Sequence, residues 1–150
     1  MDVTWKDLAL PLAAGAALYV ANTAFLGWLF SLDPSLQGLI YGRGPWWLRE
    51  SMLVKTLYVG IIAPFIEELA FRRLLLGFFI ARKKAVAGLL LSSILFGAWH
   101  LAFGWGVLKA LDMTVVGLIF GLTYWRWKFK GSLLAHYANN LLAVIAMSYA

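Results

Sequence analysis

The sequence contains no cysteine among its 150 residues and little charge of either sign. The absence of thiols excludes a cysteine nucleophile, disulfide bonds and cysteine-ligated zinc, and it says nothing about the redox state of the compartment. Charged residues make up only 13% of the chain, and histidine occurs twice. Each ionisable side chain within an apolar stretch is therefore a candidate functional group.

The composition is typical of a membrane protein. Hydrophobic residues make up 63% of the chain and aromatic residues 16%, and the mean hydropathy is +0.80. A soluble domain has an apolar share of about 45–50%. The length leaves room for a single domain, residues 1–150. We therefore expect an all-α, polytopic helical bundle that is embedded in the membrane, with a site between its helices.

Apolar stretches separated by polar segments predict about five membrane spans. They are residues 8–30, 51–81, 85–103, 111–125 and 133–150. The second stretch exceeds the roughly 20 residues of one upright helix, and Pro64 within it predicts a kink or a break. The first stretch is too long for a signal peptide, and no small-residue cleavage site follows it, so we expect it to stay as a span.

The positive charges are clustered between these stretches. The net charge is +6. If five spans alternate, one side of the membrane carries Lys6 and the basic clusters at 82–84 and 126–130, whereas the other carries isolated basic residues such as Arg43 and Lys109. The positive-inside rule then predicts a cytoplasmic N-terminus. Because this pattern describes membrane topology, we expect no nucleic-acid partner.

Two adjacent glutamates, Glu67 and Glu68, lie inside the second stretch, in the string PFIEELAFRR. Carboxylates at membrane depth usually mark functional sites, because their burial is costly. In a helix, Glu68 and Arg72 share one face and can form an ion pair, whereas Glu67 points about 100° away. Glu67 is therefore the free carboxylate on this segment and a candidate general base.

The only two histidines also lie in apolar stretches. His100 ends the string FGAWH, and His136 begins HYANN, in which Asn140 shares its helical face. Each histidine alone could be a packing residue that bonds to a neighbouring helix. Two histidines and a free glutamate from three apolar stretches are explained more simply by one shared polar site.

Helix rise predicts unequal depths for these groups. Glu67 and His100 would each lie about 20 Å from the turn at 82–84, but His136 only about 10 Å from Lys130. A shared site therefore requires tilted helices or a short interfacial segment.

Three motifs follow one another along the chain. They are E-E-x-x-x-R at Glu67, Glu68 and Arg72, F-x-x-x-H at Phe96 and His100, and H-x-x-x-N at His136 and Asn140. In this order and on successive helices, they resemble the motifs of the CPBP family, which comprises CAAX-type prenyl-protein endopeptidases and bacteriocin-processing enzymes. The resemblance covers about residues 63–140, the motif-bearing core.

The resemblance implies a glutamate-dependent intramembrane protease without a cofactor. Of the motif residues, Glu67 and His100 would activate a water molecule, and Glu68 with Arg72 would support the site. His136 and Asn140 would stabilise the oxyanion. The chemistry of these groups agrees, because an amide NH₂ or an imidazole N–H can donate to an oxyanion, which an ionised carboxylate cannot.

Zinc is an alternative to metal-free catalysis, since two histidines and two carboxylates could ligate it, although H-E-x-x-H is absent. A serine dyad is a further alternative, because Ser132 with His136 and Ser93 with His100 have helical register. Serines in membrane helices usually bond to backbone carbonyls, however, and G-x-S-G is missing. The GxxxG pair Gly117 and Gly121 is typical of close helix packing.

We expect the substrate to be a membrane-associated peptide or protein, such as a peptide precursor or a C-terminal sorting signal. The expected location, among membrane lipids, is the inner membrane of a prokaryotic cell. Trp99, Phe103 and Trp105 near His100 are more typical of an interface belt than of a lipid pocket. Two other functions stay open: a non-catalytic immunity or adaptor protein, and a small transporter with a Glu–His proton relay.

Overall fold

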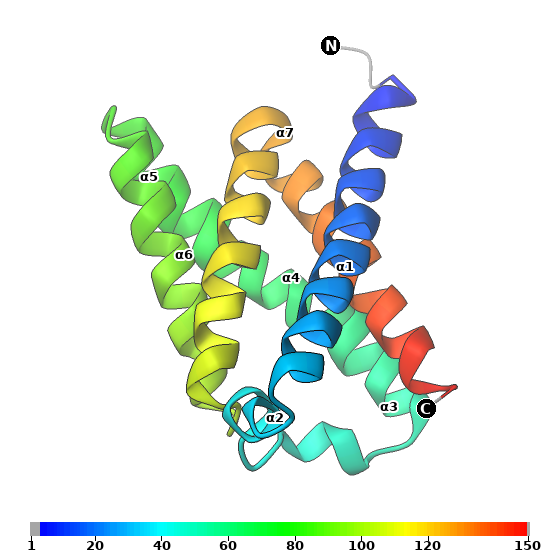
Figure 1. Cartoon of the computed structure of the whole chain (residues 1–150). Coiled ribbons are helices and arrows are strands. Elements are labelled where there is room, and N and C mark those ends of the chain that lie inside the picture. The colour runs from blue at the N-terminus through cyan, green and yellow to red at the C-terminus, as the bar shows by residue number, and fades with distance from the viewer. Residues whose placement is uncertain (1–3, 150) are drawn as a thin grey trace.

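The computed structural model describes residues 4–149, and all regular secondary structure in that range is helical, which confirms the all-α prediction. Helix α1 (Lys6–Leu32) leads through the short helix α2 (Leu36–Tyr41) and a 3₁₀ turn, η1 (Trp46–Arg49), to the segment that carries the two glutamates. Figure 1 shows α1 along one side of the bundle, with α2 at its lower end.

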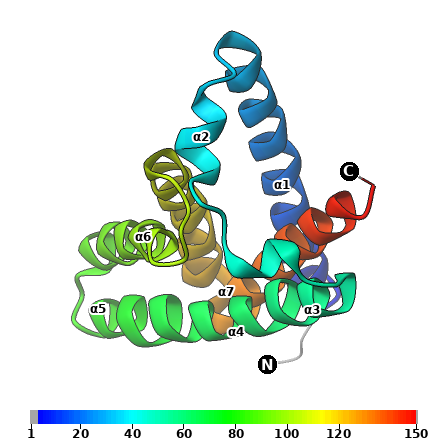
Figure 2. The ribbon, with the colours of Figure 1, turned by 90° about the horizontal axis from the view of Figure 1, so that it is seen from below.

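The glutamates lie on one helical rod that runs from Met52 to Ala81 along the lower edge of the view in Figure 2. Its segments are α3 (Met52–Leu57), η2 (Tyr58–Ile62), α4 (Ala63–Glu67), η3 (Glu68–Leu76) and α5 (Gly77–Ala81), of which η2 and η3 are π-helical. Pro64 does not break this rod. It stands in the first turn of α4, directly after the wide turns of η2, where its missing N–H is tolerated.

Two further helices complete the bundle. Helix α6 (Ala85–Leu101) returns beside α5, and α7 (Val107–Met147) has 41 residues. Helix α7 bends where Lys128 leaves the helical conformation, with φ of 59° and ψ of −159°. The predicted fourth and fifth spans correspond to the two halves of α7. The bend lies within the basic cluster at 126–130 that was expected between them, and helix resumes directly after Lys128.

Two helices, α1 and α7, are long and apolar enough to cross a membrane by length and composition. Helix α6 is apolar but shorter, with 17 residues. Large apolar side chains are exposed on the helices, among them Leu53, Leu74 and Val86. An exposed apolar surface of this kind suits contact with lipid.

Helix α7 lies at the centre and packs against α1, α6 and the η3 segment of the rod. The core is formed by Phe96, Met113, Val116, Phe120 and Ala135. A Cβ atom on Gly117 would lie 3.1 Å from the ring of Phe96 and from Cα of Ser93, so this glycine allows α6 and α7 to approach closely. The packing interpretation of Gly117 therefore agrees with the structure.

The rod and the second half of α7 run obliquely to α1 and α6 (Figure 1). Tilt thus accounts for the unequal depths predicted from helix rise. Because the rod and the last part of α7 slope in the same direction, residues near the middle of the rod come level with His136.

Candidate active site

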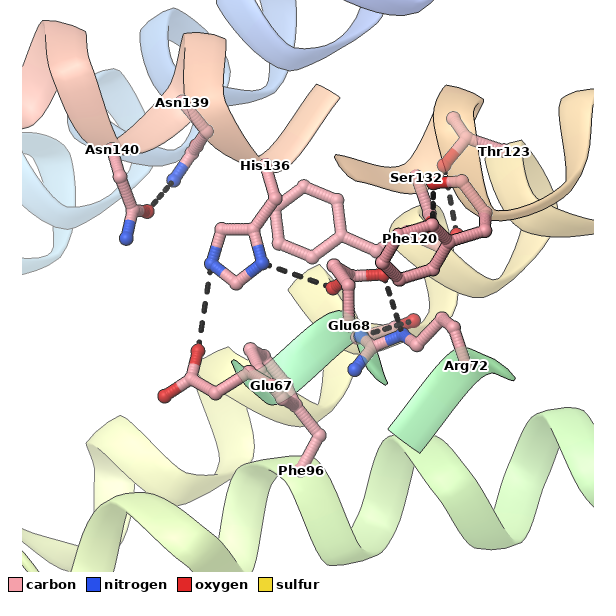
Figure 3. Close-up of polar contacts among 12 residues, drawn as sticks. Glu67, Glu68, Arg72, Phe96, Phe120, Thr123, Ser132, His136, Asn139 and Asn140 are labelled. Atoms are coloured by element: carbon pink, nitrogen blue, oxygen red, sulfur yellow. Dashed lines mark hydrogen bonds and ion pairs between the residues drawn. The ribbon is translucent and has the colours of Figure 1, made fainter. Parts of the chain in front are cut away.

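A buried cluster of carboxylates and one imidazole joins the rod to α7 (Figure 3). His136 donates from Nδ1 to Oε1 of Glu68 over 2.9 Å, and its Nε2 lies 3.6 Å from Oε2 of Glu67. The two glutamates therefore lie beside the two different nitrogens of the His136 ring. Glu67 lacks a cation on its own helix, as the spacing predicts, but α7 supplies an imidazole beside it.

Arg72 lies behind this cluster. Its Nε is 3.5 Å from Oε2 of Glu68, and one terminal nitrogen donates to the Gly117 carbonyl over 3.2 Å. Glu68 and Arg72 are both fully buried. With His136 protonated, the two glutamates and the two cations sum to zero charge, which is the condition under which buried ions are tolerated.

Aromatic rings fix the orientation of His136 and Arg72. Phe120 stacks on the His136 ring with 4.3 Å between centroids, and Phe96 meets it edge-on at 5.8 Å. The Arg72 guanidinium lies 4.3 Å from the Phe96 centroid, so Phe96 contacts both side chains. The ring of His136 can therefore rotate only if the core repacks.

His100 is held separately on α6. Its Nδ1 lies 2.9 Å from the carbonyl oxygen of Phe96, one helical turn earlier. A backbone carbonyl can only accept, so Nδ1 carries the hydrogen, and in the neutral ring Nε2 is left as an acceptor. An acceptor nitrogen is what proton abstraction from water requires.

One cavity of about 540 Å³ connects these groups. Its lining includes Glu67, His100, His136 and Asn140, which are the four predicted catalytic residues. Glu67 keeps 13% of its side chain exposed, whereas Glu68 and Arg72 do not reach the cavity. The fold thus separates the groups that can meet a substrate from those that can only act through other side chains.

The remaining walls of the cavity combine aromatic and aliphatic side chains with a few polar ones. Phe103 and Trp105 line it, so these two residues form part of the site in addition to any interface belt. A second cavity of about 510 Å³ lies between α1 and the first half of α7. The two cavities share Asn22, Leu26, Ile40 and Val116, and the second is lined by apolar residues apart from Asn22 and Asp112.

Asn140 and its neighbour Asn139 form a short chain of amides on α7 (Figure 3). Asn139 donates to the side-chain oxygen of Asn140 over 3.0 Å, and Asn140 donates to the Val59 carbonyl over 2.9 Å. Asn139 also lines the cavity. The motif H-x-x-x-N omits Asn139, but the doubled asparagine in an apolar helix was a visible signal of a second polar group.

The serine dyads and the zinc site, which the sequence left as alternatives, make different demands on this geometry. Ser93 donates to the Leu89 carbonyl over 2.7 Å, and Ser132 to the Phe129 carbonyl over 3.2 Å. Both hydroxyls therefore bond to their own helix in the way expected of structural serines. Among residues 4–149, no three His, Asp or Glu side chains converge closely enough to hold one metal ion.

The local helix geometry helps to present the carboxylates. Glu67 closes α4 and Glu68 opens the π-helical segment η3. Wide helical turns of this kind are frequent at functional sites, and successive helical residues point about 100° apart. Glu67 can therefore face the cavity while Glu68 turns into the core beneath His136.

The fold is an all-α membrane bundle, and its cavity gathers carboxylate, imidazole and amide groups. The serines near the site bond to their own helices. These are the features of an intramembrane hydrolase. A model of the Rce1-like family, described as type II CAAX prenyl endopeptidase Rce1-like, matches residues 49–142, which include all six predicted site residues. The chain belongs to this family and is therefore a CAAX-type intramembrane endopeptidase. No match was found among curated proteins or among solved structures.

Proposed function

We propose that this endopeptidase is glutamate-dependent and that Glu67 and His100 activate the attacking water. The observation that carries this proposal is the single cavity reached by Glu67, His100, His136 and Asn140 from three helical segments. Peptide hydrolysis without a side-chain nucleophile needs a base for water and donors for the developing oxyanion. Glu67 and His100 offer acceptors for the proton of water.

His136 and Asn140 are the proposed donors to the oxyanion. When protonated, His136 carries an N–H on Nε2 at the cavity side, since Nδ1 is directed to Glu68. Asn140 has a second N–H besides the one directed to Val59. Both donors are held by contacts within the protein, so they need little reorganisation when charge develops on the carbonyl oxygen.

Glu68 and Arg72 act as positioning residues in this mechanism. Glu68 holds the ring of His136 through Nδ1, and Arg72 holds Glu68. A carboxylate behind a histidine stabilises one ring orientation and the imidazolium form. Neither residue touches the substrate, because neither lines the cavity.

For the substrate, we propose a membrane-associated peptide or protein, such as a peptide precursor or a C-terminal sorting signal. The apolar cavity between α1 and α7, which shares residues with the catalytic cavity, supports a substrate with an apolar part that lies in the bilayer. We further propose a prokaryotic inner membrane and a cytoplasmic N-terminus. The start of α1, the α5–α6 turn and the bend of α7, which carry the basic clusters, lie at one end of the bundle (Figure 1).

The experiment that tests the mechanism is Glu67→Gln. Glutamine keeps the size of the side chain but cannot take up a proton, so cleavage of an internally quenched prenylated CAAX peptide should slow by at least about a hundredfold. The exposed Glu50→Gln variant, which removes the same charge outside the cavity, should cleave at the wild-type rate. Near-normal cleavage by Glu67→Gln would end the glutamate mechanism.

A further inference from the structure

One backbone carbonyl near the site has lost its helical partner. The N–H of Ala63 bonds to the carbonyl of Tyr58, five residues earlier. In the same pattern, the N–H of residue 64 would donate to the carbonyl of Val59. Residue 64 is proline, however, and has no N–H. The Val59 carbonyl is therefore free for a donor from another helix.

Asn140 supplies that donor. Its Nδ2 lies 2.9 Å from the Val59 oxygen. The approach is possible because the next residue is Gly60, where a Cβ atom would come within 2.7 Å of the Leu141 side chain. Pro64 thus creates the acceptor, and Gly60 lets α7 come close enough to use it.

The same contact orients Asn139. With its nitrogen directed to Val59, Asn140 presents its oxygen to Asn139, which donates to it over 3.0 Å. Among residues 4–149, the Asn139 amide makes no other protein hydrogen bond, although it lines the cavity. One N–H and the carbonyl oxygen of Asn139 are thereby left over at the cavity wall.

We propose that Asn139 binds a backbone peptide group of the substrate next to the scissile bond, and that Pro64 positions it through Val59 and Asn140. This proposal rests on the proposed function. A primary amide with one free N–H and one free oxygen matches the C=O and N–H of a peptide group. The recognised chemistry is the extended peptide backbone, so the contact is independent of substrate side chains. Asn140 keeps its second N–H for the oxyanion.

The binding role of Asn139 is tested with Asn139→Ala and with Asn139→Leu, which is similar in size but neither donates nor accepts a hydrogen bond. With the quenched prenylated CAAX peptide, each should raise KM by roughly three- to tenfold with kcat within about twofold of wild type, the effect of one or two lost hydrogen bonds. In the Glu67→Gln background, Asn139→Ala should weaken binding of the same peptide equally. Gln37→Ala, an exposed amide on α2, is the control and should change neither constant. Unchanged KM and Kd, or a loss confined to kcat, would overturn the proposal.

The positioning role of Pro64 is tested by stability, without any substrate. Asn140→Ala should lower the unfolding midpoint in detergent by roughly 3–8 °C, because it strands the Val59 carbonyl. In the Pro64→Ala background, residue 64 regains an N–H, and the same change should cost at most half as much. Equal losses in both backgrounds would overturn the link between Pro64 and Asn140. Since this cycle needs no turnover, it separates failure of this inference from failure of the proteolytic function.

Discussion

At the scale of single residues, the site depends on one ion pair that the solvent does not reach. Glu68 is held by Arg72 on one oxygen and by His136 on the other, and all three side chains are buried. Removal of either member of a buried pair leaves the other uncompensated, which costs roughly 3–5 kcal/mol. The pair therefore positions His136, and its loss should first lower the stability of the folded protein.

We expect Glu68→Ala and Arg72→Ala each to lower the unfolding temperature in detergent, and the double variant to recover part of the loss. Recovery should be incomplete, because Nδ1 of His136 loses its acceptor whenever Glu68 is absent. Thermal unfolding of the four proteins forms a double-mutant cycle, with the exposed Glu50→Ala as the control. Fully additive losses would show that Glu68 and Arg72 do not interact.

At the scale of elements, the bend of α7 decides where His136 lies. Lys128 has φ of 59° and ψ of −159°, a conformation that glycine adopts readily and other residues only with strain of about 1–3 kcal/mol. Helix resumes after it, so the second half of α7 slopes along the rod (Figure 1). The non-helical conformation of Lys128 thus sets the direction of the segment that carries His136, Asn139 and Asn140.

Lys128→Gly should therefore raise the unfolding temperature or leave it unchanged, since the relief of strain offsets the entropy that glycine loses on folding. Lys130→Gly is the matched control. Residue 130 is helical, so glycine there should destabilise by about 1 kcal/mol. Equal destabilisation by both substitutions would contradict the non-helical conformation of Lys128.

At the scale of the whole molecule, three helical segments bring the polar groups of the cavity together, and the proposed mechanism uses them without a metal. The proposed mechanism uses Glu67 as a base and His100 as its partner, and Asn140 is a good donor to an oxyanion but a poor zinc ligand. We expect the purified protein to contain no stoichiometric zinc and to keep its activity after exhaustive chelation, as measured by elemental analysis alongside a chelator titration. About one zinc per chain, with activity lost on removal and restored on return, would make Glu67, His100 and His136 ligands instead.

Much of this architecture could be read from the residues alone. Apolar stretches separated by basic clusters predicted a bundle of helices, because the backbone of a segment in lipid must satisfy its own hydrogen bonds. The rarity of polar groups in those stretches singled out Glu67, His100 and His136, because burial of such groups is costly without a use. Asn140 was added because it shares a helical face with His136. The spacing of Glu68 and Arg72 predicted their contact through helical periodicity alone.

Other features depend on contacts between segments far apart in the chain, which periodicity does not encode. Glu68 accepts a hydrogen bond from His136 across 68 positions, and Asn140 reaches Val59 across 81. Pro64 was expected to kink or break its helix. The rod continues through it, because a π-helical segment precedes it and Asn140 on α7 bonds to the Val59 carbonyl, which the missing N–H leaves free. The sequence by itself determined which polar groups must be satisfied inside the bundle. Only the tertiary structure decided which partner satisfies each, because the tilt of the rod and the bend at Lys128 set those distances.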